Sequence, residues 1–192
     1  MLRTGVLCTS ASFDGEGNGV GEPLEVALLE AGAEAGLERD TLLAEYPEIR
    51  RESFDPDVKM MATFHRRGTG VLETVKGAPE AVLETCTQVA GGGGIRDLDD
   101  SARQAWLKRG RELAERGMRL IAVAQRERDN AEGNPYRDLT FLGIVGLVDP
   151  VRDSVREPIG QCRRAGVRVV MVTGDLRDTA MALGRQRALL NG

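Results

Sequence analysis

The chain has 192 residues, of which 41% are hydrophobic, 4% aromatic and 29% charged, and its formal net charge is −4. This length is enough for one large domain, or for one domain and part of another. The mild acidity argues against nucleic acid as a partner, because proteins that bind nucleic acid carry a basic face. It does not exclude a nucleotide, since a few local lysines suffice to bind one polyphosphate.

Cysteine usage and hydropathy narrow the class of protein further. The three cysteines, Cys8, Cys86 and Cys162, are far apart and form no CxxC pair, which argues against a zinc site and a disulfide framework and fits a reducing compartment. The longest apolar run, residues 141–148, is too short to span a bilayer. No signal peptide is recognisable in residues 1–10. We therefore expect the chain itself to be soluble.

The first third of the chain predicts a loop, a helix and paired strands. Residues 15–23 are rich in glycine and predict a flexible loop. A helix is expected to begin at Pro23, a residue that suits a first helical turn, and to end within residues 32–36. Alternating residues between 54 and 75, with a turn at 67–70, predict paired strands.

The middle of the chain predicts two more helices and a strand. Residues 79–86 follow the paired strands and predict a short helix that begins with a proline. Asp99 or Asp100 is expected to cap a longer helix that ends near Gly117. Residues 120–124 are apolar and predict the strand that follows.

The polar segment 129–138 is the best candidate for a hinge, because the pattern changes after it. Strands are predicted at 139–148 and 167–173, and helices at 153–165 and 177–190. This alternation predicts parallel strands joined by a right-handed crossover. We therefore divide the chain into a domain at 1–138 and part of a second domain at 139–192, and expect the first to fold without the second.

Two strings at the ends of the predicted parallel strands are candidates for phosphate binding. Thr173, Gly174 and Asp175 follow one strand, where free amides at the start of the next helix suit a phosphate. Asp149 and Arg152 follow the other strand and reach the same edge of the sheet. Residues 173–175 alone favour an ordinary strand-to-helix turn, whereas the two strings together favour a ligand site.

Two strings in the first domain are candidates for binding a nucleotide. KGAPE at 76–80 places the charge of Lys76 beside the open backbone of Gly77, which is useful near a phosphate or a base. The alternative is a strand end with a solvated lysine. Phe54 begins FDPDVKMM, and an aromatic ring can stack on adenine, whereas the alternative is a phenylalanine of the core.

Other conspicuous residues predict structure and no chemistry. His65, the only histidine, lies in strand-like alternation, and Trp106 falls on one face of a predicted helix. The neighbouring acids Asp99 and Asp100 are typical of a solvated helix cap. Because no cluster of carboxylates has the spacing of metal ligands, we predict no metal site in this chain.

Several strings, in this order, resemble the nucleotide-binding and phosphorylation domains of P-type cation-transporting ATPases. They are LCTSA at 7–11, GEPLEVALL at 21–29, FDPDVKMM at 54–61, KGAPE at 76–80, RGMRLIAVA at 116–124, DPVR at 149–152 and TGD at 173–175. KGAPE together with GEPLEVALL resembles the ion-pumping branch that handles calcium, sodium, potassium or magnesium. The phosphorylated aspartate of the family lies in a DKTGT string, and this chain has neither that string nor the GDGxND string that follows TGD in the family.

The resemblance implies an α/β fold. It consists of an α+β nucleotide-binding domain, with a mainly antiparallel sheet flanked by helices, followed by a partial Rossmann-like βαβα segment of the haloacid dehalogenase type. Phe54 would stack on adenine and Glu25 would face the amino edge of the base. The implied nucleotide-binding residues are Glu25, Phe54, Lys59, Lys76, Gly77 and Arg119, and the implied phosphate-side residues are Asp149, Arg152, Thr173, Gly174 and Asp175. Val58 stands where the family often has arginine, which removes one positive charge.

By the same resemblance, the intact protein would couple ATP hydrolysis, through an aspartyl-phosphate, to cation transport across a membrane. This chain would be an ATP-binding cytoplasmic fragment of that membrane protein, inactive alone, with Mg²⁺ needed only in the intact protein. Its partners would be the transmembrane and actuator domains, and another copy through the incomplete second sheet. Two alternatives stay open: a fragment of a soluble haloacid dehalogenase-like phosphatase, whose DxDx[TV] string is absent, and a non-catalytic nucleotide-binding module.

Overall fold

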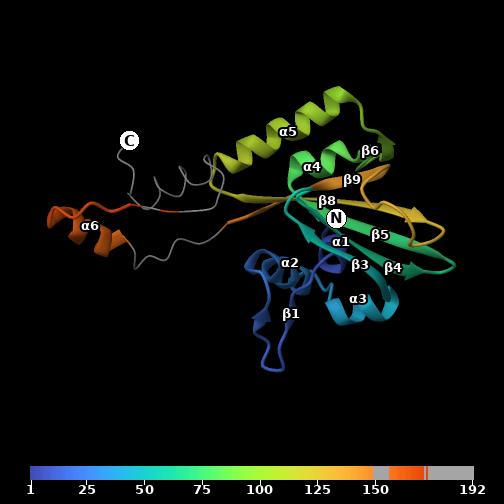
Figure 1. Ribbon diagram of the computed structural model, residues 1–192, viewed down its shortest axis with the longest axis horizontal. Helices are drawn as coiled ribbons and strands as arrows, with labels where there is room; N and C mark the ends of the chain where they lie inside the picture. Colours follow the sequence, from blue (N-terminus) through green and yellow to red (C-terminus); the bar gives the residue numbers. More distant parts are fainter. Residues whose placement is uncertain (149–155, 171, 173–192) are drawn as a thin grey trace. The chain divides into compact units, whose positions relative to one another are not determined.

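A seven-stranded mixed sheet organises the computed structural model, which describes residues 1–148, 156–170 and 172 (Figure 1). The helices are α1 (Leu2–Leu7), α2 (Pro23–Glu34), α3 (Arg39–Glu45), α4 (Pro79–Glu84), α5 (Asp100–Ala114) and α6 (Arg156–Arg164). The strands are β1 (Ser12–Phe13), β2 (Gly19–Val20), β3 (Glu48–Asp55), β4 (Met60–Arg67), β5 (Gly70–Gly77), β6 (Cys86–Gly91), β7 (Gly94–Asp97), β8 (Arg119–Arg128) and β9 (Leu139–Leu147). No described helix is both long and apolar enough to cross a membrane.

The large sheet has the strand order β3-β4-β5-β8-β9-β6-β7. Neighbouring pairs from β3 to β8 are antiparallel, as is β6 with β7, whereas β6 and β9 run parallel. The predicted α+β domain with a mainly antiparallel sheet is therefore confirmed. The chain divides into two units, one of residues 1–107 with 121–145 and one of 108–120 with the described residues from 146 onward.

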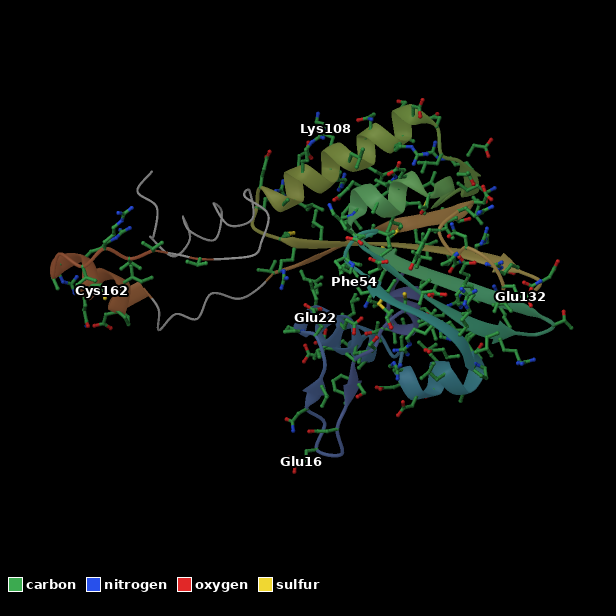
Figure 2. All side chains as sticks on the ribbon, in the orientation of Figure 1. Glu16, Glu22, Phe54, Lys108, Glu132 and Cys162 are labelled. Carbon is green, nitrogen blue, oxygen red and sulfur yellow. The ribbon has the colours of Figure 1, made fainter. Side chains whose placement is uncertain are left out.

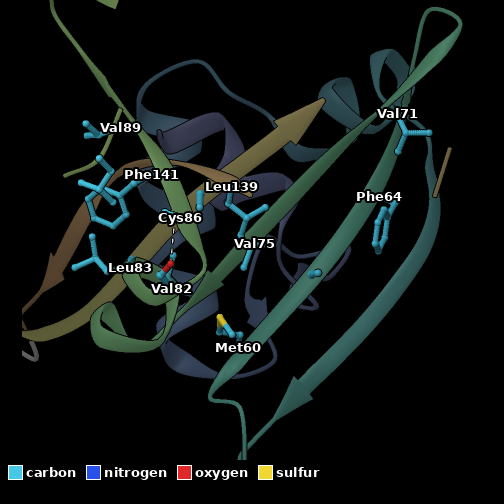
Figure 3. Packing of buried hydrophobic residues seen from close by; sticks show 14 residues of the cluster. Met60, Phe64, Val71, Val75, Val82, Leu83, Cys86, Val89, Leu139 and Phe141 are labelled. Carbon is cyan, nitrogen blue, oxygen red and sulfur yellow. Dashed lines mark hydrogen bonds between the residues drawn. The ribbon is translucent and has the colours of Figure 1, made fainter. Parts of the chain in front are cut away.

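Alternation along the central strands separates two apolar clusters in the first unit, since successive side chains of a strand point to opposite faces. On one face, Phe64 and Val75 belong to a cluster that also includes Val82 and Leu83 of α4 and Phe141 of β9 (Figure 3). On the other face, Leu72 packs with Leu7 of α1 and with residues of α2 and α3. Both faces of the central strands are thus covered by helices (Figure 1).

Local signals explain where the helices begin. Pro79 begins α4 and Pro23 begins α2, where the Glu22 carboxylate also accepts a hydrogen bond from the Leu24 amide. Asp99 accepts from the Ala102 amide at 2.7 Å, which confirms the predicted cap of α5. α4 ends at Glu84, two residues earlier than predicted, because the chain turns there into β6.

Several sequence predictions need correction. Residues 15–23 are not a simple loop, since β1 and β2 pair as a short hairpin. Helix α1 and most of β3 were missed, because neither has a clear period. The strand at 139–148 exists as β9, but it lies inside the large sheet between β8 and β6, and not in a separate βαβα segment.

In the rest of the predicted second domain, only the first predicted helix is confirmed. α6 lies within the predicted range 153–165. The strand predicted at 167–173 does not form within its described residues 167–170, where Val167 and Val170 are exposed. The helix predicted at 177–190 lies outside the described residues.

Candidate functional site

The first turn of α2 and the end of β5 bring an acid and a base together inside the first unit. Glu25 Oε1 and Lys76 Nζ are 2.5 Å apart, and the two side chains are only 12% and 7% exposed. The other carboxylate oxygen of Glu25 accepts hydrogen bonds from the amides of Ser10 and Ala11, each at 3.0 Å. Both oxygens of Glu25 are thus held by positively polarised groups.

These contacts decide the charge state of the pair's carboxyl group. Burial raises the pKa of Glu25, but the hydrogen bond and the charge of Lys76, together with the two amides, outweigh burial and leave the pKa below its ordinary value. Glu25 is therefore ionised at neutral pH. Cys8 lies fully buried nearby and donates to the Thr74 carbonyl, and burial raises the pKa of its thiol, so Cys8 is no nucleophile.

Lys59 and Gly77 lie side by side where β4 begins and β5 ends. Met60 pairs with Gly77 across the two strands, and the Lys59 carbonyl accepts a hydrogen bond from the Ala78 amide at 3.0 Å. A Cβ atom on Gly77 would stand 2.3 Å from the Lys59 carbonyl oxygen, so no side chain fits there. The Lys59 ammonium is exposed and lies 3.4 Å from a carboxylate oxygen of Glu80.

Phe54 lies near the end of β3 and is 59% exposed, so it is not a core residue (Figure 2). The next residue, Asp55, pairs with Met60, and Met60 pairs with Gly77. Phe54 of β3 and Gly77 of β5 therefore lie at one end of the sheet, and Lys59 lies there too, immediately before β4. An exposed aromatic ring and an exposed ammonium group at one end of a sheet are suited to a base with an attached phosphate.

The remaining predicted residues fall into two groups. Arg119 is exposed and is the first residue of β8, and Val58, which stands in place of a family arginine, is also exposed. The phosphate-side residues Asp149, Arg152, Thr173, Gly174 and Asp175 lie outside the described residues. Among the residues that are described, no three His, Cys, Asp or Glu side chains are grouped so as to hold a metal ion.

His65 and Trp106 have the structural environments that the sequence predicted. The fully buried His65 ring lies 2.9 Å from the Tyr46 carbonyl oxygen and 2.8 Å from the Thr63 hydroxyl. Burial lowers the pKa of His65 below its ordinary value, although the Tyr46 carbonyl opposes this. The Trp106 ring packs edge-on against Phe141, with centroids 5.1 Å apart.

Sequence reasoning missed the contribution of the connection after α1. The amides of Ser10 and Ala11 bind Glu25 through the backbone, which leaves no signature in side-chain type. Arg51 of β3 donates to the Ser10 hydroxyl, and no motif pointed to it. The LCTSA string at 7–11 marked this segment as similar to the family, but not the contacts that it makes.

Residues 1–154 match the family described as "P-type ATPase, cytoplasmic domain N". The chain belongs to this family. The resemblance recognised in the sequence is thereby confirmed, and it rests on a match over most of the chain.

Curated relatives agree with this family. The chain is 33% identical over 189 residues to "Calcium-transporting ATPase 1" of Bacillus cereus, covering 97% of this chain and 21% of that protein. It is 32% identical over 198 residues to "Calcium-transporting ATPase" of Bacillus subtilis, covering 99% and 22%. It is 30% identical over 202 residues to "Cation-transporting ATPase pma1" of Synechocystis, covering 98% and 21%. The chain thus spans about a fifth of the length of the curated relatives it matches.

Proposed function

We propose that this chain binds ATP or ADP as the nucleotide-binding part of a P-type cation-transporting ATPase. The observation that carries the proposal is the buried pair of Glu25 and Lys76, two residues of separate family strings that the fold joins at 2.5 Å. Phe54, Lys59 and Gly77 at the end of the same sheet support it. We propose the site residues Glu25, Phe54, Lys59, Lys76 and Gly77 on this basis, and we propose Arg119 from the family resemblance alone.

Each side chain has a distinct task in this proposal. The exposed Phe54 ring stacks on the base, a contact worth about 1–3 kcal/mol in systems that bind single strands. The ionised Glu25 carboxylate accepts from the amino group of adenine, and Lys76 holds that carboxylate in its charged form. The exposed Lys59 ammonium attracts phosphate. The bare backbone at Gly77 lets the end of β5 lie directly against the Lys59 carbonyl and the start of β4.

The activity of the whole pump belongs to the same proposal. A longer protein that includes this segment would transfer the γ-phosphoryl group of ATP to an aspartate and move a cation across a membrane. Its transmembrane and actuator domains would be the partners of this chain, and Mg²⁺ would be needed for that transfer. Because DKTGT is absent here, we propose that the 192-residue chain does not turn over ATP.

The position of β9 changes the proposed boundary between the two domains. A boundary at residues 138 and 139 would remove β9 from the middle of the sheet. We propose instead that the nucleotide-binding domain includes β9 and ends near Leu147. The phosphorylation domain then begins close to Asp149 and Arg152, which we propose, with residues 173–175, as its phosphate-side residues.

Amide chemical shifts recorded during a titration with ADP, without Mg²⁺, test the nucleotide site. We expect the amides of Glu25, Phe54, Lys59 and Lys76 to shift, and those of the distant β6–β7 hairpin to stay in place. Shifts confined to residues 149–180 would contradict this site. Incubation with ATP labelled in its γ-phosphate should leave the protein unlabelled, and a hydroxylamine-sensitive phosphoprotein would contradict the absence of turnover.

A further inference from the structure

We infer that Arg51 is a positioning residue of the nucleotide site: it fixes the Ser10–Ala11 amides that hold the Glu25 carboxylate, and so sets the preference for adenine. This inference rests on the proposed binding of ATP. Arg51 lies on β3, 26 positions after Glu25 in the sequence (51 − 25), and belongs to none of the strings that resemble the family. It reaches the site only through the connection that follows α1.

The guanidinium group of Arg51 is held along one edge by both carboxylate oxygens of Glu48. Nε donates to Oε1 of Glu48 at 2.8 Å, and Nη2 donates to Oε2 at 2.7 Å. This fork-to-fork geometry fixes the plane of the guanidinium group and leaves Nη1 to point away from Glu48. Nη1 donates to the Ser10 hydroxyl at 2.9 Å. Glu48 therefore orients the guanidinium group, which in turn binds Ser10.

Ser10 connects this arrangement to the candidate site. Its hydroxyl accepts from Arg51, and its own amide donates to Oε2 of Glu25 at 3.0 Å. The Ala11 amide donates to the same oxygen, and Arg39 donates to the carbonyl of the preceding residue, Thr9, at 3.3 Å. The connection is thus tied to the body of the domain by two arginines. Loss of the Arg51 tie frees Ser10, one of the two amide donors to Glu25.

The consequence for binding follows from the geometry of a carboxylate. Lys76 holds one oxygen of Glu25 and the two amides hold the other, so the plane of the carboxylate is set by the protein before any base arrives. A preset acceptor favours a ligand that presents an amino group to it. Adenine presents an amino group at its 6-position, whereas hypoxanthine presents a carbonyl oxygen there, which a carboxylate repels. Arg51 therefore acts on the choice of base without touching it.

A simple charge effect is the competing explanation. Arg51 is cationic, and any cation near the site attracts a polyphosphate. Lysine keeps this charge but lacks the planar fork, so Arg51→Lys separates the two explanations. Ser10→Ala removes the hydroxyl that Arg51 binds and leaves every charge in place. Arg50→Lys is a matched control, since Arg50 is the neighbouring residue of β3, points to the other face of the sheet and binds the segment near Gly133.

The experiment measures dissociation constants of ATP and ITP for the 192-residue chain and these variants. We expect Arg51→Lys and Ser10→Ala each to weaken ATP binding by about fivefold, equivalent to roughly 1 kcal/mol, and to leave ITP binding nearly unchanged. The double variant should be no worse than either single variant, because both remove the same contact. Arg50→Lys should leave the ratio of the two constants as in the natural chain.

Two results would overturn the role inferred for Arg51. An unchanged ratio of ATP to ITP affinity in Ser10→Ala and Arg51→Lys overturns the inference, even if both ligands bind more weakly. Retained affinity in Arg51→Lys, together with loss of both ligands in Arg51→Gln, assigns Arg51 to a charge effect and also overturns it. If Arg51→Lys fails to fold, Ser10→Ala decides alone. If the natural chain binds neither nucleotide, the proposed function itself is wrong.

Discussion

Glu25 and Lys76 lie 51 positions apart in the sequence and form one buried ion pair, with 2.5 Å between Oε1 and Nζ. Removal of one partner leaves the other charge buried without compensation. We predict that Lys76→Met lowers the free energy of unfolding by about 3–5 kcal/mol, as measured by urea denaturation. The double variant with Glu25→Gln should regain most of this loss, because it leaves no isolated charge. A loss below about 1 kcal/mol for Lys76→Met would show that the pair behaves as if it were exposed.

The same pair predicts a dependence of stability on pH. Because the pKa of Glu25 is lower in the folded chain than its ordinary value of 4.5, the ionised carboxylate stabilises the fold above that value. This stabilisation is lost as the pH falls through the lower, folded pKa. We predict that the difference in unfolding free energy between the natural chain and Glu25→Gln is constant near pH 7 and shrinks below about pH 4.5. A difference that persists unchanged to about pH 3 would contradict the lowered pKa.

Sequence patterns predicted those elements whose signals are local. Alternation along β4 and β5 and the proline at the start of α2 correspond directly to the structure. The sheet membership of β9 was predicted wrongly, because a continuous apolar run fits any strand covered on both faces. What places β9 beside β6 is the pairing of Cys86 with Leu139, a contact between distant segments.

Contacts between distant segments were also what the sequence failed to predict at the candidate site. Phe54 and Lys76 were candidates from their own local sequence, and Glu25 and Lys59 only through the family resemblance. No spacing rule would join Glu25 to Lys76. The amides of Ser10 and Ala11 were not predictable, since any residue type supplies an amide. Arg51 was missed because its task depends on where Glu48 and Ser10 lie in space, and neither is near it in any recognisable motif.

Gly77 provides a test of close packing at the site. A methyl group there would stand 2.3 Å from the Lys59 carbonyl oxygen and 2.9 Å from the Met60 Cα atom, so strands must move apart. We predict that Gly77→Ala lowers the free energy of unfolding by about 1–3 kcal/mol. We also expect it to weaken ADP binding. Gly91→Ala is the control, because a methyl group there meets no atom within 4 Å. Equal effects of the two substitutions on stability would contradict a packing requirement at Gly77.

A second buried carboxylate lies on the opposite face of β5. The fully buried Glu73 accepts hydrogen bonds from Arg126 at 2.9 Å and from Arg128 at 2.8 Å. We predict that Glu73→Ala costs about 3–5 kcal/mol in urea denaturation, because two largely buried cations lose the buried carboxylate that both of them bind. The control is Glu127→Ala on neighbouring β8, whose pair with Arg67 is exposed and should cost less than about 1 kcal/mol. Similar costs for the two would mean that burial does not decide the strength of these pairs.

Phe54 should contribute to binding but not to stability. Its ring is exposed at the sheet end, so Phe54→Ala removes little buried apolar surface. We predict that this substitution weakens ADP binding by about 1–3 kcal/mol, the range for base stacking, and leaves the urea midpoint nearly unchanged. Ile95→Ala is the control for an exposed apolar residue on the far strand β7 and should change neither quantity. A large loss of stability in Phe54→Ala would place the ring in the core.

The position of β9 predicts how the chain tolerates truncation. The sequence alone suggested that a chain ending at Asp138 would fold, but β9 lies between β8 and β6, and its Leu139 and Phe141 are fully buried. Removal of β9 exposes the apolar partners of Phe141, including Trp106, and leaves β6 with β7 as its remaining partner. We predict that residues 1–138 do not fold cooperatively, whereas residues 1–148 unfold in one transition and bind ADP. Hydrogen exchange of the full chain provides a second measurement. The amides of 139–141 should exchange as slowly as those of 71–75. The amides of 167–170, which form no strand, should exchange much faster. A stable, ADP-binding 1–138 chain would show that β9 is dispensable and would restore the boundary at Asp138.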